Sequence, residues 1–105
     1  MQFIVIAYDG KDSGAEERRM AARKEHIELG DKMRAEGKVL FGVALLDEAN
    51  KMVGSVYIVN FSNRDELDQW LKVEPYVVGD VWRDIRIELC KVGPSFEDIV
   101  KSAGS

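Results

Sequence analysis

Features that define several protein classes are scarce in this chain of 105 residues. A single cysteine, Cys90, excludes an internal disulfide and makes the cytoplasm the expected location. No apolar run approaches the roughly 18 residues typical of a membrane span, so we expect no membrane partner. The chain begins directly in strand-like sequence, without the basic and apolar segments of a secretion signal. The formal net charge of −4 argues against a nucleic-acid partner.

Motifs for metal, cofactor or nucleophilic chemistry are also missing. The chain has one histidine and one cysteine, far apart, and this spacing predicts no metal site. Its glycines are scattered rather than gathered in a phosphate-binding loop, so we expect no cofactor. No serine, histidine and acid form a recognisable triad, and Cys90 lies in an alternating apolar segment that is typical of packing.

The remaining sequence is that of one globular domain spanning residues 1–105, with 46% hydrophobic and 32% charged residues. Strand-like segments cover residues 2–8, 38–46, 52–61 and 82–92. A long helix is expected within residues 13–37, and a shorter one from Ser62 or Asn63 until Pro75 stops it. Residues 76–80 are expected to form a loop, and a short helix follows Ser95. This βαββαβ order predicts an α+β, ferredoxin-like fold: a four-stranded antiparallel sheet with two helices on one face, plus a short C-terminal helix.

The predicted sheet has a consequence for assembly. The segments 2–8 and 52–61 are apolar on both faces, whereas both helices cover only one face. An uncovered apolar face of this size normally meets another chain. We therefore expect a homodimer.

The long helix carries charged residues where an apolar centre is expected. On a helical wheel, Arg19, Arg23, His26 and Gly30 share one stripe, and a capping box of Ser13 and Glu16 precedes it. This stripe is flanked by Ala15, Ala22, Leu29 and Met33 on one side and by Met20 and Ile27 on the other. Buried charges are costly unless they are paired or face a wet pocket. Two interpretations remain open: a ligand pocket, or arginines that extend to the rim beside a hydrogen-bonded core histidine.

Three short motifs together carry a family resemblance. They are Arg18-Arg19 followed by Arg23 and His26, then Leu40-Phe41-Gly42, then Glu74-Pro75-Tyr76-Val77. In this order, over residues 3 to 96, the chain resembles the YCII-related (YciI-like) proteins. The resemblance implies a ferredoxin-like fold, a dimer of the α+β-barrel type, and a site centred on a histidine and an acid. By position these residues are His26 and Glu74, where the family usually has aspartate and this chain has an acid one methylene longer.

The predicted chemistry is proton transfer or elimination on a small anionic or hydroxyaromatic molecule. An imidazole beside a carboxylate acts as a general acid–base pair, here His26 and Glu74. Arg19 and Arg23 could hold an anionic group, with Gly42 and Tyr76 as walls. The family is similar to lactone isomerases, and one branch is associated with dehydrochlorination of a hydroxylated aromatic. The alternative is a non-catalytic dimeric module that binds a small ligand or serves a larger assembly.

Overall fold

The computed structural model describes residues 1–104 of the protein, and the side chains of residues 1–100. Its elements in chain order are β1 (Gln2–Asp9), α1 (Ala15–Ala35), β2 (Val39–Leu46), β3 (Met52–Asn60), α2 (Arg64–Val73), α3 (Pro75–Val78), β4 (Trp82–Cys90), the 3₁₀ turn η1 (Pro94–Phe96) and α4 (Glu97–Gly104). All strand pairs are antiparallel, in the order β2-β3-β1-β4. The predicted α+β, ferredoxin-like fold is confirmed.

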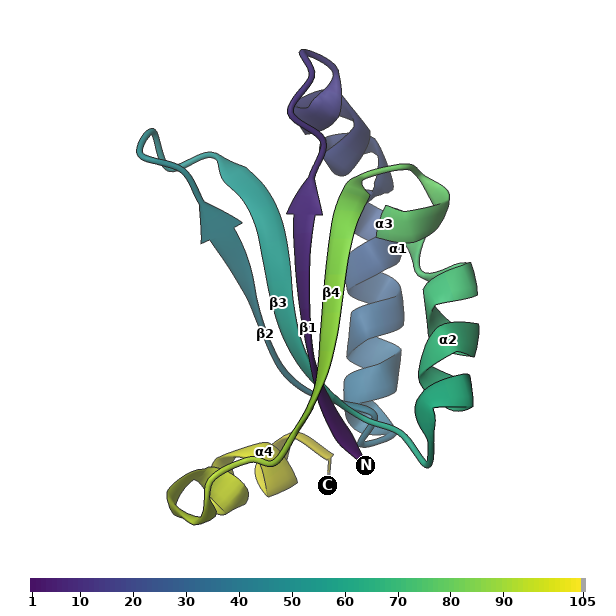
Figure 1. The fold of residues 1–105 in the computed structure, drawn as a ribbon, viewed down its shortest axis with the longest axis vertical. Coiled ribbons are helices and arrows are strands. Elements are labelled where there is room, and N and C mark those ends of the chain that lie inside the picture. Colours follow the sequence, from purple (N-terminus) through teal and green to yellow (C-terminus); the bar gives the residue numbers. More distant parts are fainter. Residues whose placement is uncertain (105) are drawn as a thin grey trace.

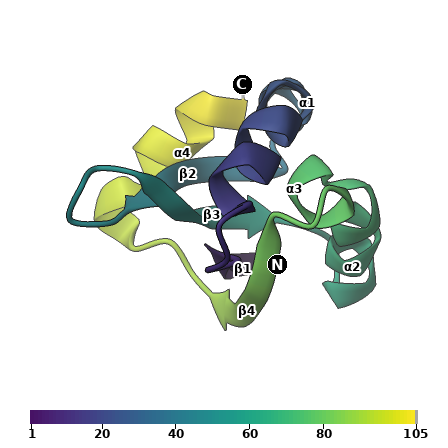
Figure 2. The same cartoon turned by 90° about the horizontal axis from the view of Figure 1, so that it is seen from above.

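The helices α1 and α2 lie side by side on one face of the sheet (Figure 1). Seen from above, α4 lies beside the edge strand β2 (Figure 2). None of the helices in the described part of the chain is both long and apolar enough to cross a bilayer.

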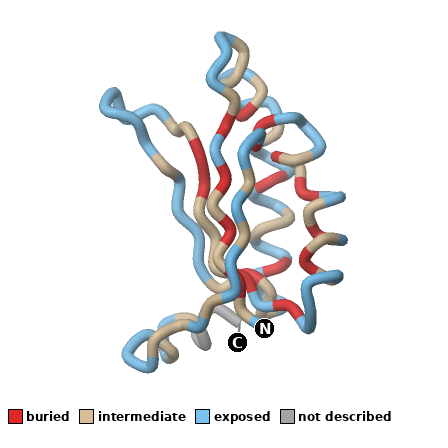
Figure 3. The backbone as a smooth tube through the Cα atoms, viewed as in Figure 1, coloured by how far each residue is buried: buried red, intermediate tan, exposed pale blue. Residues whose placement is uncertain are grey.

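The core lies between the sheet and the helices α1 and α2 (Figure 3). Along β1 the side chains alternate: Phe3, Val5 and Ala7 are buried, whereas Ile4 and Ile6 are half-buried on the opposite face. The helices contribute buried residues such as Met33 from α1 and Leu67 and Trp70 from α2. Full burial of a side chain such as Leu67 contributes about 1.5–3 kcal/mol to folding.

The start of α1 differs from its prediction, whereas its end agrees. Gly14 occupies the N-cap and has no side-chain cap bond, so the predicted capping box of Ser13 and Glu16 is wrong. Instead, the Asp12 carboxylate accepts the Gly14 N–H at 3.2 Å and the Asp12 carbonyl accepts the Ala15 N–H at 3.2 Å. At the other end, Gly37 has φ 77° just beyond the helix, as predicted for a glycine that ends a helix.

One flank of α1 is not packed. Met20 and Ile27 were expected beside the core, but they are 54% and 40% exposed, so this prediction is wrong. The buried residues of α1 are Arg19, His26 and Met33, one line at a spacing of seven. On the flank of Ile27 a cavity separates α1 from β2 and β3.

The segment after α2 also differs from its prediction. Asn63 caps α2 by accepting the Glu66 N–H at 2.9 Å, and Pro75 follows the end of this helix, both as expected. Residues 76–80 were expected to be a loop, but Pro75–Val78 form the short helix α3. Proline is favoured in the first turn of a helix because its fixed φ is already helical. The preceding Glu74 stays extended, with φ −63° and ψ 121°, and caps α3 with its side chain.

Candidate functional site

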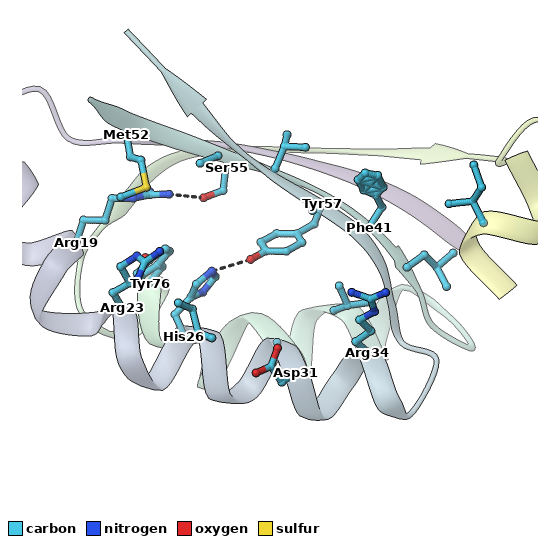
Figure 4. A pocket seen from close by; sticks show the side chains of 18 residues that line it. Arg19, Arg23, His26, Asp31, Arg34, Phe41, Met52, Ser55, Tyr57 and Tyr76 are labelled. Atoms are coloured by element: carbon cyan, nitrogen blue, oxygen red, sulfur yellow. Dashed lines mark hydrogen bonds between the residues drawn. The ribbon is translucent and has the colours of Figure 1, made fainter. Parts of the chain in front are cut away.

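A cavity of about 490 Å³ opens between α1 and the strands β2 and β3 (Figure 4). The central stripe of α1 lines it, as the pocket interpretation of the helical wheel predicts. The predicted site residues on its wall are Arg19, Arg23, His26, Gly42 and Tyr76. The remaining one, Glu74, is buried behind His26.

The structure brings the two predicted acid–base residues into contact. His26 Nδ1 lies 2.6 Å from Glu74 Oε1, and the two side chains are 8% and 2% exposed. The same carboxylate oxygen accepts the backbone N–H of Tyr76 at 2.9 Å. Pro75 disfavours a helical Glu74, and the extended conformation turns this carboxylate back over the first turn of α3. The longer acid of this chain therefore still reaches the imidazole.

Tyr57 completes a row of three side chains. Its hydroxyl lies 2.6 Å from His26 Nε2, although the two residues are 31 positions apart. When Glu74 is ionised, the ring proton of His26 is on Nδ1, and this N–H donates a hydrogen bond to the carboxylate. Nε2 then accepts a hydrogen bond from the Tyr57 hydroxyl. Burial raises the pKa of Tyr57, and the nearby Glu74 charge raises it further. The phenol is therefore a neutral hydrogen-bond donor near neutral pH.

Gly42 sets the position of the Tyr57 ring. The two residues are paired across β2 and β3, and a Cβ built on Gly42 would overlap the ring, reaching 2.6 Å from Cδ1. A glycine inside a strand often marks a place where another group comes close to the backbone, and at Gly42 that group is this ring.

Tyr76 supports the imidazole from its flat side. The rings of Tyr76 and His26 are stacked, with centroids 3.7 Å apart and an interplanar angle of 8°. Tyr76 is only 2% exposed, and burial raises the pKa of its phenol. Its main effect is therefore to hold the imidazole plane between α1 and α3.

Arg19 was predicted to bind substrate, but its guanidinium is engaged within the protein. Its Nη1 donates to both carboxylate oxygens of Asp9, at 2.9 and 3.1 Å. Its Nη2 donates to the carbonyl of Gly54 and to Ser55 Oγ, both at 3.0 Å. The Arg19 and Asp9 side chains are 4% and 3% exposed. Arg19 therefore has a structural role, as in the second interpretation of the helical wheel. It differs from that interpretation in one respect: the guanidinium is buried in an ion pair and does not extend to the rim.

The side chain of Arg23 has a different environment. It is exposed, lines the cavity, and forms none of the ion pairs found among the described side chains. Arg34, farther along the same helix, has the same three properties. Figure 4 shows both residues on the α1 wall, on either side of His26. Their guanidinium groups are therefore available to an anionic ligand.

Arg18, the first residue of the family motif in α1, serves a structural purpose. It donates to both carboxylate oxygens of Asp12, at 2.8 and 2.7 Å, and to the carbonyl of Asp80 at 3.0 Å. Arg83 bridges the same two aspartates. The Arg18 guanidinium lowers the pKa of Asp12. These contacts tie the loop before α1 to the loop before β4.

Sequence reasoning missed Tyr57, Asp9 and Ser55. A signal for Tyr57 was present, because alternation along β3 places it on the same face as the buried Ser55 and Val59. For Asp9, the signal was its position at the end of an alternating strand whose odd-numbered residues are buried.

The fold and the site together define a ferredoxin-like α+β domain with a cavity built around a histidine, an acid and a tyrosine. The family model for the YCII-related domain matches residues 1–91, which is most of the chain. The protein therefore belongs to the YCII-related family. Residues 92–105, which include η1 and α4, lie outside the match.

Solved structures with the same fold include 5-chloro-2-hydroxyhydroquinone dehydrochlorinase (TftG) from Burkholderia phenoliruptrix AC1100, in complex with 2,5-dihydroxybenzoquinone. It is 20% identical, with a TM-score of 0.73, and the alignment covers 90% of this chain and 98% of that one. An antibiotic biosynthesis monooxygenase is 18% identical with a TM-score of 0.50, over 89% of this chain and 98% of that one. Rv0793 from Mycobacterium tuberculosis is 16% identical with a TM-score of 0.50, over 90% and 96%. At these identities the likeness establishes the fold alone. No match was found among curated protein sequences.

Proposed function

We propose that this protein is an enzyme that performs acid–base chemistry, either proton transfer or elimination, on a small anionic or hydroxyaromatic molecule. The observation that carries the proposal is the contact between His26 and the buried Glu74 at the wall of the cavity. A buried carboxylate beside an imidazole favours the protonated ring that forms when a base accepts a proton. Glu74 is thereby the group that stabilises His26 during the reaction.

Arg23, rather than Arg19, is the residue that we propose for binding the anionic group of the substrate. A guanidinium binds an oxyanion through charge-assisted hydrogen bonds, and it does so only with N–H groups that the protein has not already used. Arg19 donates to Asp9, Gly54 and Ser55, whereas Arg23 faces the cavity without an ion-pair partner among the described side chains.

The structure of TftG suggests which molecules to test first. That protein is a dehydrochlorinase for 5-chloro-2-hydroxyhydroquinone and was solved with 2,5-dihydroxybenzoquinone bound. Both molecules are small hydroxylated rings, in keeping with a cavity of about 490 Å³ that combines arginines with apolar side chains. The likeness in fold makes them probes for this protein and does not make either one its substrate.

The test is a panel of hydroxylated aromatics, with and without a chloride substituent, assayed for chloride release and for exchange of ring protons. We expect turnover of at least one compound and a loss of roughly 10²–10⁴-fold in His26→Ala and Glu74→Gln, because general acid–base catalysis contributes about this much. Glu28→Gln, on the exposed side of α1, is the matched control for the second variant. Saturable binding of 2,5-dihydroxybenzoquinone without turnover of any compound would instead support the non-catalytic ligand-binding module.

A homodimer is the assembly that we propose. Ile4 pairs with Ile58 and Ile6 with Val56, and these four half-buried side chains share the face opposite the helices. Tyr8, on the same face, is 46% exposed. A second copy of the chain packed on this face would remove the apolar surface from water. Location in the cytoplasm remains part of the proposal and is supported by the single cysteine.

A further inference from the structure

The imidazole of His26 has both of its nitrogens bonded within the protein. Nδ1 lies 2.6 Å from Glu74 Oε1, and Nε2 lies 2.6 Å from the Tyr57 hydroxyl. A general base needs a lone pair within hydrogen-bond distance of the proton that it accepts. In this arrangement His26 has no such lone pair to offer a ligand directly. A ligand proton can reach Nε2 only through Tyr57, or after Tyr57 has moved away.

Tyr57 is held firmly in its position. The ring of Tyr57 lies so close to Gly42 that a Cβ at this position would overlap it. Trp70 and Trp82 pack against it, with ring centroids 6.3 and 6.0 Å away. Tyr57 nevertheless lines the cavity, and Figure 4 shows its hydroxyl turned toward His26. The side chain is therefore held by its neighbours at a position on the cavity wall.

We propose that Tyr57 is the catalytic residue that contacts the substrate, and that His26 and Glu74 accept and stabilise the proton through it. This inference rests on the acid–base function proposed above. It also narrows the substrate class to a molecule with an acidic hydroxyl, such as a phenol, a hydroxyquinone or an enol. Such a hydroxyl can donate a hydrogen bond to the Tyr57 oxygen while the Tyr57 proton points at Nε2.

The proton step is a relay of two transfers. The substrate O–H bond breaks as a new O–H bond forms on Tyr57, and the original Tyr57 proton forms an N–H bond at Nε2 of His26. The electron pair left on the substrate oxygen forms a C=O bond, and the π pair of the adjacent C=C bond shifts away from it. In a proton transfer this π pair takes up a proton from water at carbon. In an elimination it forms a C=C bond to the next carbon and expels an anionic leaving group there with the electrons of its bond. The proton on His26 later returns through Tyr57 to water. No oxidant or reductant is required, and Glu74 stays ionised beside the imidazolium.

The raised pKa of Tyr57 supports this order of events. Burial is the main cause, and the charge of Glu74 adds to it. The phenol therefore keeps its proton near neutral pH and can pass it to Nε2 at the moment when it receives another. A phenolate at this position would be the base by itself and would leave His26 without a purpose in the reaction.

The experiment compares wild type, Tyr57→Phe, His26→Ala and the control Glu28→Gln, on the exposed side of α1. Binding of 2,5-dihydroxybenzoquinone is measured by titration, and turnover is measured with the hydroxyaromatic panel. For Tyr57→Phe we expect affinity to fall by up to about tenfold, since the hydrogen bond between the ligand hydroxyl and the Tyr57 oxygen is lost. Turnover should fall roughly 10²–10⁴-fold. Glu28→Gln should match wild type.

A second variant tests the position of the hydroxyl while keeping it. Gly42→Ala displaces the Tyr57 ring, so it should lower turnover in the same direction although the tyrosine remains. If Tyr57→Phe binds and turns over like wild type while His26→Ala is inactive, the relay is refuted and the acid–base function stands, with His26 facing the ligand itself. If wild type neither binds the probe nor turns over any compound, the proposed function fails and the relay fails with it.

Discussion

The buried pair of Arg19 and Asp9 gives the sharpest prediction about stability. In Arg19→Ala the Asp9 carboxylate, which is 3% exposed in its side chain, loses two hydrogen bonds and its only ion-pair partner among the described side chains. Removing one partner of a buried ion pair costs about 3–5 kcal/mol, because the remaining charge is left uncompensated. A domain of this size is stable by roughly 5–15 kcal/mol in total, so this loss is a large fraction.

The assay is thermal unfolding at one fixed protomer concentration, because a dimer makes the melting temperature depend on concentration. A loss of about 1 kcal/mol lowers the melting temperature of a domain of this size by roughly 4–8 °C. Arg19→Ala should therefore melt at least about 12 °C below wild type. The matched control is Arg23→Ala on the same helix, which is exposed and should stay within about 0.5 kcal/mol of wild type.

A double variant separates lost charge pairing from lost packing. Arg19→Met combined with Asp9→Leu removes both charges and fills similar volume, so it should recover most of the stability that Arg19→Ala loses. The reasoning is refuted if Arg19→Ala melts as close to wild type as Arg23→Ala does. In that case the Arg19 guanidinium would be dispensable for the fold, and its assignment to substrate binding would regain support.

Three further predictions concern the cavity and the assembly. Gly30→Ala should stabilise the protein by about 0.5–1 kcal/mol, since a Cβ there meets no described atom within 4 Å and alanine favours a helix interior. The same methyl group enters the cavity, so binding of 2,5-dihydroxybenzoquinone should weaken; a melt below wild type would contradict the first half of this prediction. Glu74→Asp shortens an acid that now lies 2.6 Å from His26, and turnover should fall unless α3 shifts; unchanged rates would mean that this contact does not matter. Light scattering at micromolar concentration should give about twice 11.9 kDa for wild type and one protomer for Ile6→Asp, and a wild-type monomer would exclude the dimer.

Several parts of the protein are determined by local sequence. The period of each segment predicts the βαββαβ order, Asn63 and Gly37 bound their helices as expected, and Pro75 keeps Glu74 extended. These features depend on backbone preferences and on side chains a few positions away, so they can be inferred without knowing the fold. The stripe of Arg19 and His26 belongs to the same group, because a helical wheel depends only on the spacing of residues along one helix.

Tertiary structure alone decided what each member of that stripe does. Arg19 meets Asp9 and His26 meets Tyr57 because the antiparallel register of β1 and β3 sets which strand residues lie opposite α1. A helical wheel gives the direction of a side chain but not its partner. The sequence therefore does not reveal that Arg19 is buried in an ion pair whereas Arg23 is exposed. Arg19 and Asp9 are 10 positions apart in the sequence, and His26 and Glu74 are 48 positions apart. The hydrogen bonds of both pairs form only when separate elements pack together. That docking is set by the burial of the whole core, which no single segment encodes.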